Sequence, residues 1–332
     1  TINTVLDGSD FAGASLQGAS FKNMSMQKAD FSAYTAGQGG DQKKETEAQN
    51  AKFDNVNLTS ATFKGLALNK GAILSGAQFI NANLTLAAFD YAVLDNAKFT
   101  FKEPYGQMVR GSGLYPTKFL YKISFKNASL KNVSFVIGAS TDNPFKKTDF
   151  TNAVLSGANL KDLDLTDDCS FKDANFDTTI LNNTKLTGAD LSGIKNFNKA
   201  KLTYGADQKY TYLASVNFKG ATLSSSTKKL DLSGFNLSGI GSASPKGCNF
   251  TNADLTGAIL SKTNLQSAII TGANFTNVDL SNSDLRNVDL SKLKKYKSSI
   301  TLTGAWVNEN TKDFDGNTYS SSSALVFPSK SF

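Results

Sequence analysis

Residues 248–290 read CNFTNADLTGAILSKTNLQSAIITGANFTNVDLSNSDLRNVDL, and a large apolar residue recurs in this stretch at every fifth position. Phe250, Leu255 and Leu260 begin the series, and Leu290 ends it. A small residue such as Ala253 stands two places before each large one. Self-similarity at a short fixed period is typical of a solenoid, in which each repeat buries its apolar face against its neighbours.

A period of five residues fits neither a straight strand nor an α-helix. On a strand, side chains alternate between faces, so an odd period would place successive large residues on opposite faces. On an α-helix, steps of five residues would scatter them around the whole circumference. The large residues all face inward only if the chain turns a corner in every pentad and winds around a filled core. We therefore expect a closed coil whose turns stack through backbone hydrogen bonds about 4.8 Å apart.

The pentads themselves resemble those of the pentapeptide repeat protein family. The sequence has Ala-Asn-Leu-Lys-Asp at 158–162, Ala-Asp-Leu-Ser-Gly at 189–193 and Ala-Asp-Leu-Thr-Gly at 253–257. The resemblance implies an all-β fold, a right-handed quadrilateral β-helix with four pentads per coil. It also implies that the central residue of each pentad and the residue two places before it are buried.

The central residues predict both the core and its layering. Through Phe135 they mostly alternate Phe and Leu, so four pentads per coil would stack Phe on two opposite walls and Leu on the other two. One extra residue near Gly71 and another near Asp167 shift the frame, as bulges at corners would. The clearest predicted core residues are Phe150, Leu155, Leu160, Phe250, Leu255, Leu260, Leu265, Ile270, Phe275 and Leu280.

The repeat pattern also sets the expected domain organisation. We expect one β-helix over residues 1–290 and a C-terminal cap and tail over residues 291–332. Non-repetitive stretches predict interruptions of the helix near residues 32–52, 100–122, 136–144, 203–214 and 238–247.

Composition excludes much chemistry. The 332-residue chain has no histidine, which removes the commonest general base and the commonest metal ligand. Its two cysteines, Cys169 and Cys248, both occupy the small inward position and are expected to pack as buried thiols. Aspartates such as Asp254 precede the central residue, where we expect them to accept hydrogen bonds within turns. We therefore expect no enzyme activity, no catalytic residue, no metal and no cofactor.

The charge of the chain is positive, +7 at pH 7, and lysines recur at the outward position after the central residue. A row of lysines could bind an anionic surface, or it could simply face solvent. No cluster of Arg with aromatic residues indicates a specific nucleic-acid site. The lysines at this position are Lys22, Lys64, Lys126, Lys131, Lys146, Lys161, Lys172 and Lys219.

The interruption at 100–122 is the predicted partner-binding segment. It combines aromatic residues with one arginine, residue types that are enriched at binding hot spots. Packing of its aromatic side chains on the coil wall is the alternative. The candidate partner-binding residues are Tyr105, Met108, Arg110, Tyr115, Phe119 and Tyr121.

The function that the sequence favours is a non-enzymatic structural or interaction protein that presents loops to a macromolecular partner or assembly. Self-association through an open N-terminal coil is a further expectation, because the repeats begin by Leu6 and an unpaired strand edge invites pairing. The family resemblance implies one alternative, binding of DNA gyrase as a mimic of duplex DNA, which the positive charge disfavours. No apolar run is long enough to cross a membrane.

Overall fold

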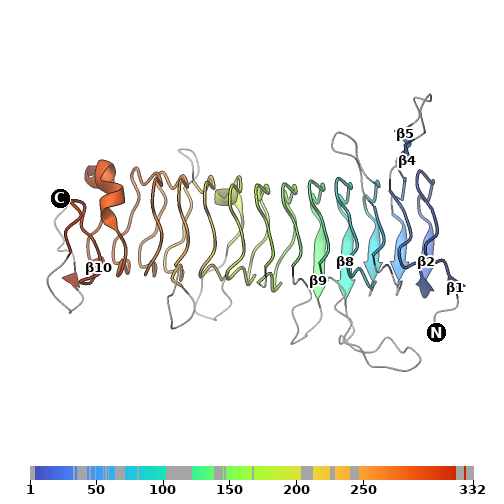
Figure 1. Ribbon diagram of the computed structural model, residues 1–332, viewed down its shortest axis with the longest axis horizontal. Helices are drawn as coiled ribbons and strands as arrows, with labels where there is room; N and C mark the ends of the chain where they lie inside the picture. The colour runs from blue at the N-terminus through green and yellow to red at the C-terminus, as the bar shows by residue number, and fades with distance from the viewer. Residues whose placement is uncertain are drawn as a thin grey trace, which may run out of the picture. The chain divides into compact units, whose positions relative to one another are not determined.

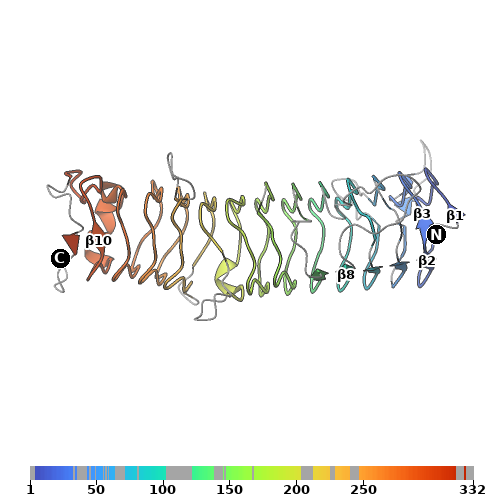
Figure 2. The same ribbon diagram turned by 90° about the horizontal axis from the view of Figure 1, so that it is seen from below.

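The structure, a computed structural model, divides into two compact units, Thr1–Ser170 (unit 1) and Phe171–Phe332 (unit 2). It describes residues 4–32, 34–35, 43–44, 46–48, 50–54, 56, 58, 60–63, 72–80, 82–101, 122–137, 145, 147–166, 168–202, 212–224, 229–239, 247–318 and 325–326. Each unit is a stack of coils connected by parallel backbone pairing (Figures 1 and 2). The fold is of the β-helix type.

The regular elements are short because each wall of a coil is only one pentad long. The strands are β1 (Thr4–Val5), β2 (Ser20–Lys22), β3 (Met24–Ser25), β4 (Tyr34–Thr35), β5 (Lys43–Lys44), β6 (Lys52–Asp54), β7 (Gln78–Ile80), β8 (Lys98–Phe101), β9 (Ser134–Ile137), β10 (Trp306–Val307) and β11 (Leu325–Val326). Two 3₁₀ helices, η1 (Phe197–Lys199) and η2 (Leu290–Ser299), are the helical elements of the described residues.

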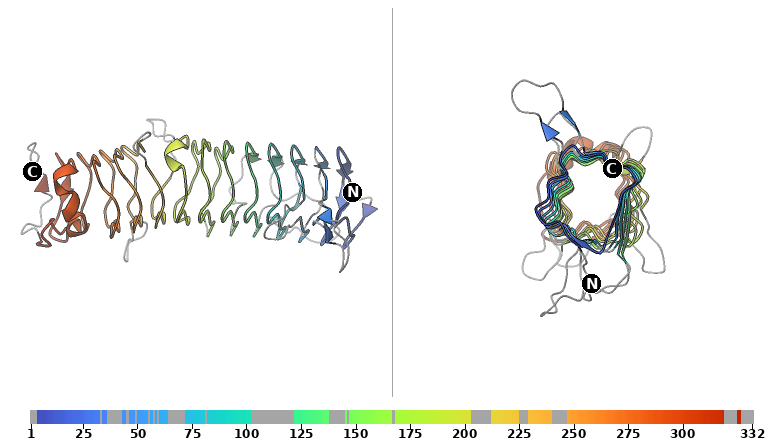
Figure 3. Two further views of the ribbon diagram at one scale, coloured as in Figure 1. Left: turned by 90° about the horizontal axis from the view of Figure 1, so that it is seen from above. Right: turned by 90° about the vertical axis from the view of Figure 1, so that its right-hand side faces the viewer.

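A coil closes after twenty residues, that is, after four pentads. Val5 pairs with Ser25 and Asp10 with Asp30, both in parallel register. Unit 2 repeats the interval, since Asp254 pairs with Asn274. Where no extra residues intervene, the strict period of the sequence thus places equivalent pentads directly above one another, as the view along the stack of unit 1 shows (Figure 3).

Extra residues lengthen the interval without changing the pairing. Near Asp167 the prediction of one extra residue is confirmed, because Asp149 pairs with Ser170. Near Gly71 the prediction is wrong: Thr62 pairs with Ala88, so six extra residues lie between Phe63 and Ala72. The sequence pattern suggested Leu68 as a central residue in that stretch, but Leu68 lies outside the described residues.

The core of unit 1 is layered as the alternation of Phe and Leu predicts. Two columns of phenylalanine rings stack along it, with ring centroids 4.5–5.2 Å apart and interplanar angles of at most 18°. Rings of the two columns meet edge to face. Both arrangements are favourable for aromatic rings. One column contains Phe11, Phe31, Phe63, Phe89, Phe125 and Phe150, and the other contains Phe21, Phe53, Phe79, Phe99 and Phe135.

All ten central residues selected from the sequence as core are at most 4% exposed. At the start of unit 1 the interior is more open: Leu6, Phe11 and Leu16 are only half-buried, and Val5 is 67% exposed. A contact made through this first coil stays a prediction.

The stack of unit 2 continues past residue 290, where the repeat pattern ends. Thr301 pairs with Asp279, Trp306 with Asp284, and Lys312 with Asp289. Helix η2 therefore takes the place of the one pentad that would follow Asp289. The edge of this last coil is covered by antiparallel pairing, in which β11 pairs with β10 and Thr318 with Lys312.

Candidate functional site

The candidate partner-binding residues Tyr105, Met108, Arg110, Tyr115, Phe119 and Tyr121 all lie outside the described residues. The structure does define where their segment, residues 102–121, leaves and rejoins the coils. It leaves after Phe101, the last residue of β8, and the chain is described again from Lys122. We call the residues at which an insertion leaves and rejoins the coils its roots; here they are Phe101 and Lys122.

A second insertion, residues 138–144, has its roots beside those of the first. It leaves after Ile137, the last residue of β9, and Ile137 is the register partner of Phe101. On the return side, the amide of Asp149 donates to the carbonyl of Ile123 over 2.9 Å. Two insertions on neighbouring coils thus begin side by side and end side by side.

The same arrangement occurs at another corner of unit 1. Residues 33–45 and 64–71 follow Ser32 and Phe63, which lie on neighbouring coils because the amide of Phe31 donates to the carbonyl of Thr62 over 2.7 Å. Both segments return next to each other, where the amide of Ile73 donates to the carbonyl of Thr46. Within the first segment, β4 and β5 pair as an antiparallel hairpin. The interruption expected over residues 32–52 is shorter than that, since Glu47 already pairs with Ser15.

The wall that ends at the first of these corners is a five-stranded parallel sheet with the order β2-β6-β7-β8-β9. The strands labelled β2, β8 and β9 follow one side of unit 1 in Figure 1. Because side chains alternate along a strand, the central phenylalanines face the core and the residues on either side of them face outward. The outward residues form one row through Ser20, Lys52, Gln78, Lys98 and Ser134, and a second row through Lys22, Asp54, Ile80, Thr100 and Val136.

Sequence reasoning missed Lys52 and Lys98 because they precede the central residue, whereas the regular lysines follow it. Of those regular lysines, Lys22, Lys126, Lys131, Lys161, Lys172 and Lys219 are exposed, and Lys64 and Lys146 lie outside the described residues. Lys52 and Lys98 are 46 positions apart in the chain, so only the pairing shows that they share a row. A search for lysines before central residues could have found them singly.

The aspartates serve the turns, as predicted. In each case a carboxylate oxygen accepts a hydrogen bond from the amide two residues later, over 2.8–3.2 Å. The eight examples are Asp10, Asp30, Asp149, Asp190, Asp254, Asp279, Asp284 and Asp289. Burial by itself would raise the pKa of Asp30, but hydrogen bonds from Ser32 and Thr62 outweigh it and lower that pKa. A carboxylate held in its ionised form in this way is poorly suited to act as a general acid.

The two thiols are buried and hydrogen-bonded. Cys169 donates to the carbonyl of Phe145 over 2.9 Å, and Cys248 to the carbonyl of Leu213 over 3.0 Å. Burial raises the pKa of Cys248 to about 12, so the thiol is un-ionised at neutral pH and a poor nucleophile. Among the described residues, no three Asp, Glu or Cys side chains are grouped so that they could hold a metal ion.

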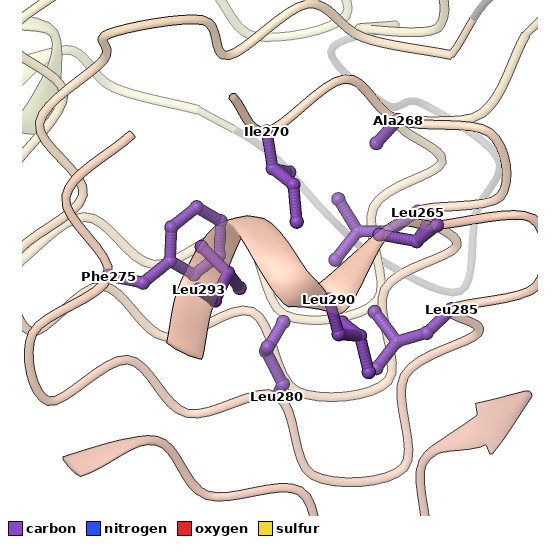
Figure 4. A pocket seen from close by; sticks show the side chains of 9 residues that line it. Leu265, Ala268, Ile270, Phe275, Leu280, Leu285, Leu290 and Leu293 are labelled. Atoms are coloured by element: carbon purple, nitrogen blue, oxygen red, sulfur yellow. The ribbon is translucent and has the colours of Figure 1, made fainter. Parts of the chain in front are cut away.

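The interior of unit 2 encloses a cavity of about 10 Å³ beside helix η2. Figure 4 shows Leu293 of η2 pointing into it with Leu280, Leu285 and Leu290. All its lining side chains are apolar, and a space of this size is close to that of a single water molecule, which would find no polar partner there. It is a packing defect where the helix replaces a pentad, and it has no room for a ligand.

No helix within the described part of the chain has both the length and the apolar composition that a membrane crossing requires.

Comparison with known proteins gives a family. The model for pentapeptide repeats matches eight copies, in residues 2–32, 70–100, 145–167, 167–193 and 247–292. A search of curated protein sequences found no significant match.

Solved structures similar to this chain are themselves pentapeptide repeat proteins or a resistance protein. HetL, from the cyanobacterium Nostoc sp. strain PCC 7120 and involved in heterocyst differentiation regulation, is 19% identical, with 94% of this chain and 92% of HetL covered and a TM-score of 0.33. A protein from the Arabidopsis thaliana thylakoid lumen is 22% identical, with 45% and 67% covered and a TM-score of 0.23. QnrB1, a plasmid-mediated fluoroquinolone resistance protein, is 15% identical, with 92% of each chain covered and a TM-score of 0.22.

The five-residue period, the stacking of coils at intervals of four pentads and the matched repeats agree, and the chain belongs to the pentapeptide repeat family.

Proposed function

We propose that this protein is a non-enzymatic interaction scaffold, a right-handed quadrilateral β-helix whose paired insertions in unit 1 contact a protein partner. The observation that carries the proposal is that insertions 102–121 and 138–144 are rooted side by side on neighbouring coils. Loops held next to each other by a regular scaffold can form one continuous surface, which is how many repeat proteins and immunoglobulin-type domains bind their partners.

The chemistry of the described residues supports a binding role over a catalytic one. The aspartates at repeat positions accept turn hydrogen bonds, and both thiols lie in the core. Insertion 102–121 also contains the aromatic residues and the arginine that commonly anchor protein interfaces.

A pull-down with purified variants tests the proposal. The variant Tyr105→Ala, Arg110→Ala, Tyr115→Ala removes the anchors of the first insertion. A matched control, Tyr204→Ala, Lys209→Ala, Tyr210→Ala, removes two tyrosines and one cation from the insertion at 203–211 in unit 2. We expect specific co-purifying proteins, quantified by mass spectrometry, to be lost with the first variant and kept with the second. Equal retention by both folded variants would assign the aromatic residues of 102–121 to packing alone.

The gyrase alternative has less support. A mimic of duplex DNA needs a strongly negative surface, whereas this chain carries a net charge of +7. We therefore propose that the protein partner is bound through the insertions and not through mimicry of duplex DNA.

A further inference from the structure

The outward face of the five-stranded sheet in unit 1 has a charge pattern that the proposed function does not use. Lys52 and Lys98 share one row, and Lys22 belongs to the neighbouring row. Lys161 extends this second row, because Ser134 pairs with Asn159 two residues earlier. All four lysines are exposed. Among the described residues, Lys22, Lys52 and Lys98 have no ion pair, and Lys161 contacts Asp162 at 3.7 Å.

The lysines recur along the stacking direction. Lys22 lies one strand before Lys52, Lys98 lies two strands after Lys52, and Lys161 lies two coils further on. With neighbouring strands about 4.8 Å apart, a positive charge recurs about every 5–10 Å along the wall. Hydroxyl and amide side chains lie between them, from Ser20, Gln78, Thr100, Ser134 and Asn159.

Another wall of the same unit carries the opposite charge. Its pairing positions include Asp10, Asp30 and Asp149, and Lys126 there is paired with Asp149 over 3.2 Å. Asp54 is the one carboxylate residue at the outward register positions of the sheet, against three lysines, with Lys161 on the next coil. The charges of unit 1 are thus distributed unequally: the rows of the sheet are mainly basic, and the wall with Asp10, Asp30 and Asp149 is mainly acidic.

We propose that the outward face of the sheet β2-β6-β7-β8-β9 binds a linear acidic polysaccharide, lying along the stack and crossing the strands. The ammonium groups of Lys22, Lys52, Lys98 and Lys161 pair with its carboxylates. The serine, threonine, glutamine and asparagine side chains between them bond to its hydroxyl groups. This inference concerns a different surface from the insertions and stands independently of the proposed function.

Charge density favours this polymer over nucleic acid. Duplex DNA carries one negative charge per about 1.7 Å of its axis, which is far denser than lysines about 5–10 Å apart. Single-stranded nucleic acid is held by aromatic platforms that stack on its bases. The sheet offers none, because all five of its central phenylalanines point inward.

A lipid bilayer also fits less well. Basic segments that bind anionic membranes carry clusters of four to eight cations, and lasting attachment adds apolar groups that enter the lipid. Here the lysines form a narrow band, and Val136, at 49% exposure, is the one exposed large apolar side chain among the described residues of these rows. Carbohydrate hydroxyls, in contrast, match the uncharged polar side chains between the lysines.

Titration calorimetry of the full chain at low ionic strength with polygalacturonate tests the proposal. Fully methyl-esterified polygalacturonate, which has the same backbone without charge, is the ligand control. The test variant is Lys52→Gln, Lys98→Gln. The control variant is Lys195→Gln, Lys219→Gln, which removes two exposed lysines of unit 2 and changes the net charge equally.

We expect saturable binding of polygalacturonate and none of its methyl ester. The test variant should bind about tenfold more weakly, the loss expected for two charge contacts near a surface, and the control variant should bind as the parent does. Equal weakening of both variants would reduce the effect to net charge and overturn the proposal. Absence of binding would also overturn it, as would tighter binding of duplex DNA or of phosphatidylserine vesicles with the same dependence on Lys52 and Lys98.

Discussion

Units 1 and 2 build the same coil from different cores. In unit 1, phenylalanine repeats at the same two walls through Phe135, and the rings stack in two columns. In unit 2, one stacked phenylalanine pair occurs in the described residues, Phe218 with Phe250 at 5.4 Å, and leucine or isoleucine fills most other central positions. The coil therefore requires an inward apolar residue of suitable volume, and the aromatic columns are one of two solutions.

The units also differ in how they deviate from the repeat. The insertions of unit 1 occur in pairs on neighbouring coils, whereas unit 2 replaces one pentad by helix η2 and covers its last edge with β11. Unit 1 thus carries paired insertions beside its stack, whereas unit 2, which also contains the insertion at 203–211, closes its own end. The predictions below test whether these differences are energetic or only geometric.

The largest expected effect is on the aromatic columns. Phe89→Ala removes a ring stacked on Phe63 and Phe125, and we expect it to cost about 3–5 kcal/mol. Phe89→Leu restores the volume used in unit 2 and should cost less than about 1.5 kcal/mol. Amide hydrogen exchange, which reports each coil separately, is the measurement. If Phe89→Leu were as damaging as Phe89→Ala, stacking and not volume would be what unit 1 requires.

The next effect concerns the closure of unit 2. Leu293 is 1% exposed and, like Leu290 of the same helix, points into the core with Leu280 (Figure 4). Leu293→Ala would enlarge the existing cavity, and we expect a loss of about 2–4 kcal/mol with faster exchange in the last coils of unit 2. Lys295→Ala, on the same helix, serves as the control and should change stability little. Unchanged exchange in Leu293→Ala would show that η2 does not stabilise the stack.

A smaller effect distinguishes two corner glycines. Gly157 of unit 1 (φ +70°) and Gly188 of unit 2 (φ +73°) share a left-handed backbone, so alanine at either site should cost about 1–2 kcal/mol. A Cβ at Gly157 would also lie 2.2 Å from Oδ1 of Asn132, while one at Gly188 meets no atom within 4 Å. Thermal unfolding should therefore show Gly157→Ala to be the worse of the two. Adding Asn132→Ala should remove the difference, and failure to do so would mean that Asn132 moves aside without cost.

The smallest effect is a pH dependence shared by both units. The pKa values of Asp30 and Asp289 are lowered below the ordinary value of 3.8. Each carboxylate therefore contributes stability above about pH 4, and this contribution is lost as the pH falls through the lowered pKa. We expect the free energy of unfolding to fall less in Asp30→Asn and in Asp289→Asn than in the parent between about pH 5 and about pH 2, the range in which aspartates of this kind take up protons. Urea unfolding at each pH is the measurement.

Salt separates the two aspartates. Asp289 lies 3.5 Å from the ammonium of Lys292 and 3.9 Å from that of Lys312, whereas Asp30 accepts hydrogen bonds from the amide of Ser32 and the hydroxyl of Thr62. Added salt screens exposed ion pairs more than hydrogen bonds. It should therefore weaken the contribution of Asp289 and leave that of Asp30 nearly unchanged. Equal salt dependence would contradict these assignments.

The period, the family and the inward residues follow from the sequence alone. A central residue is recognised from its nearest neighbours in the chain, so the burial of Phe150 or Leu255 needs no knowledge of distant contacts. The layering of phenylalanine followed for the same reason, since four pentads make one coil and alternation then repeats on each wall. The role of Asp254 in its turn is equally local, because its partner is the amide two residues later.

Which residues meet across coils is set only in the folded chain. The sequence pattern predicts one extra residue after Phe63 instead of six because Leu68 continues the five-residue period, and backbone pairing alone identifies the true register. The lengths of the intervening insertions decide that Lys52 and Lys98 share one row. They also decide that Phe101 pairs with Ile137, from which the two insertions start. After each insertion, the next residues that fit the repeat pair with the coil before them. The position of an outward side chain on the surface therefore depends on the pairing register, which cannot be read from a short stretch of sequence.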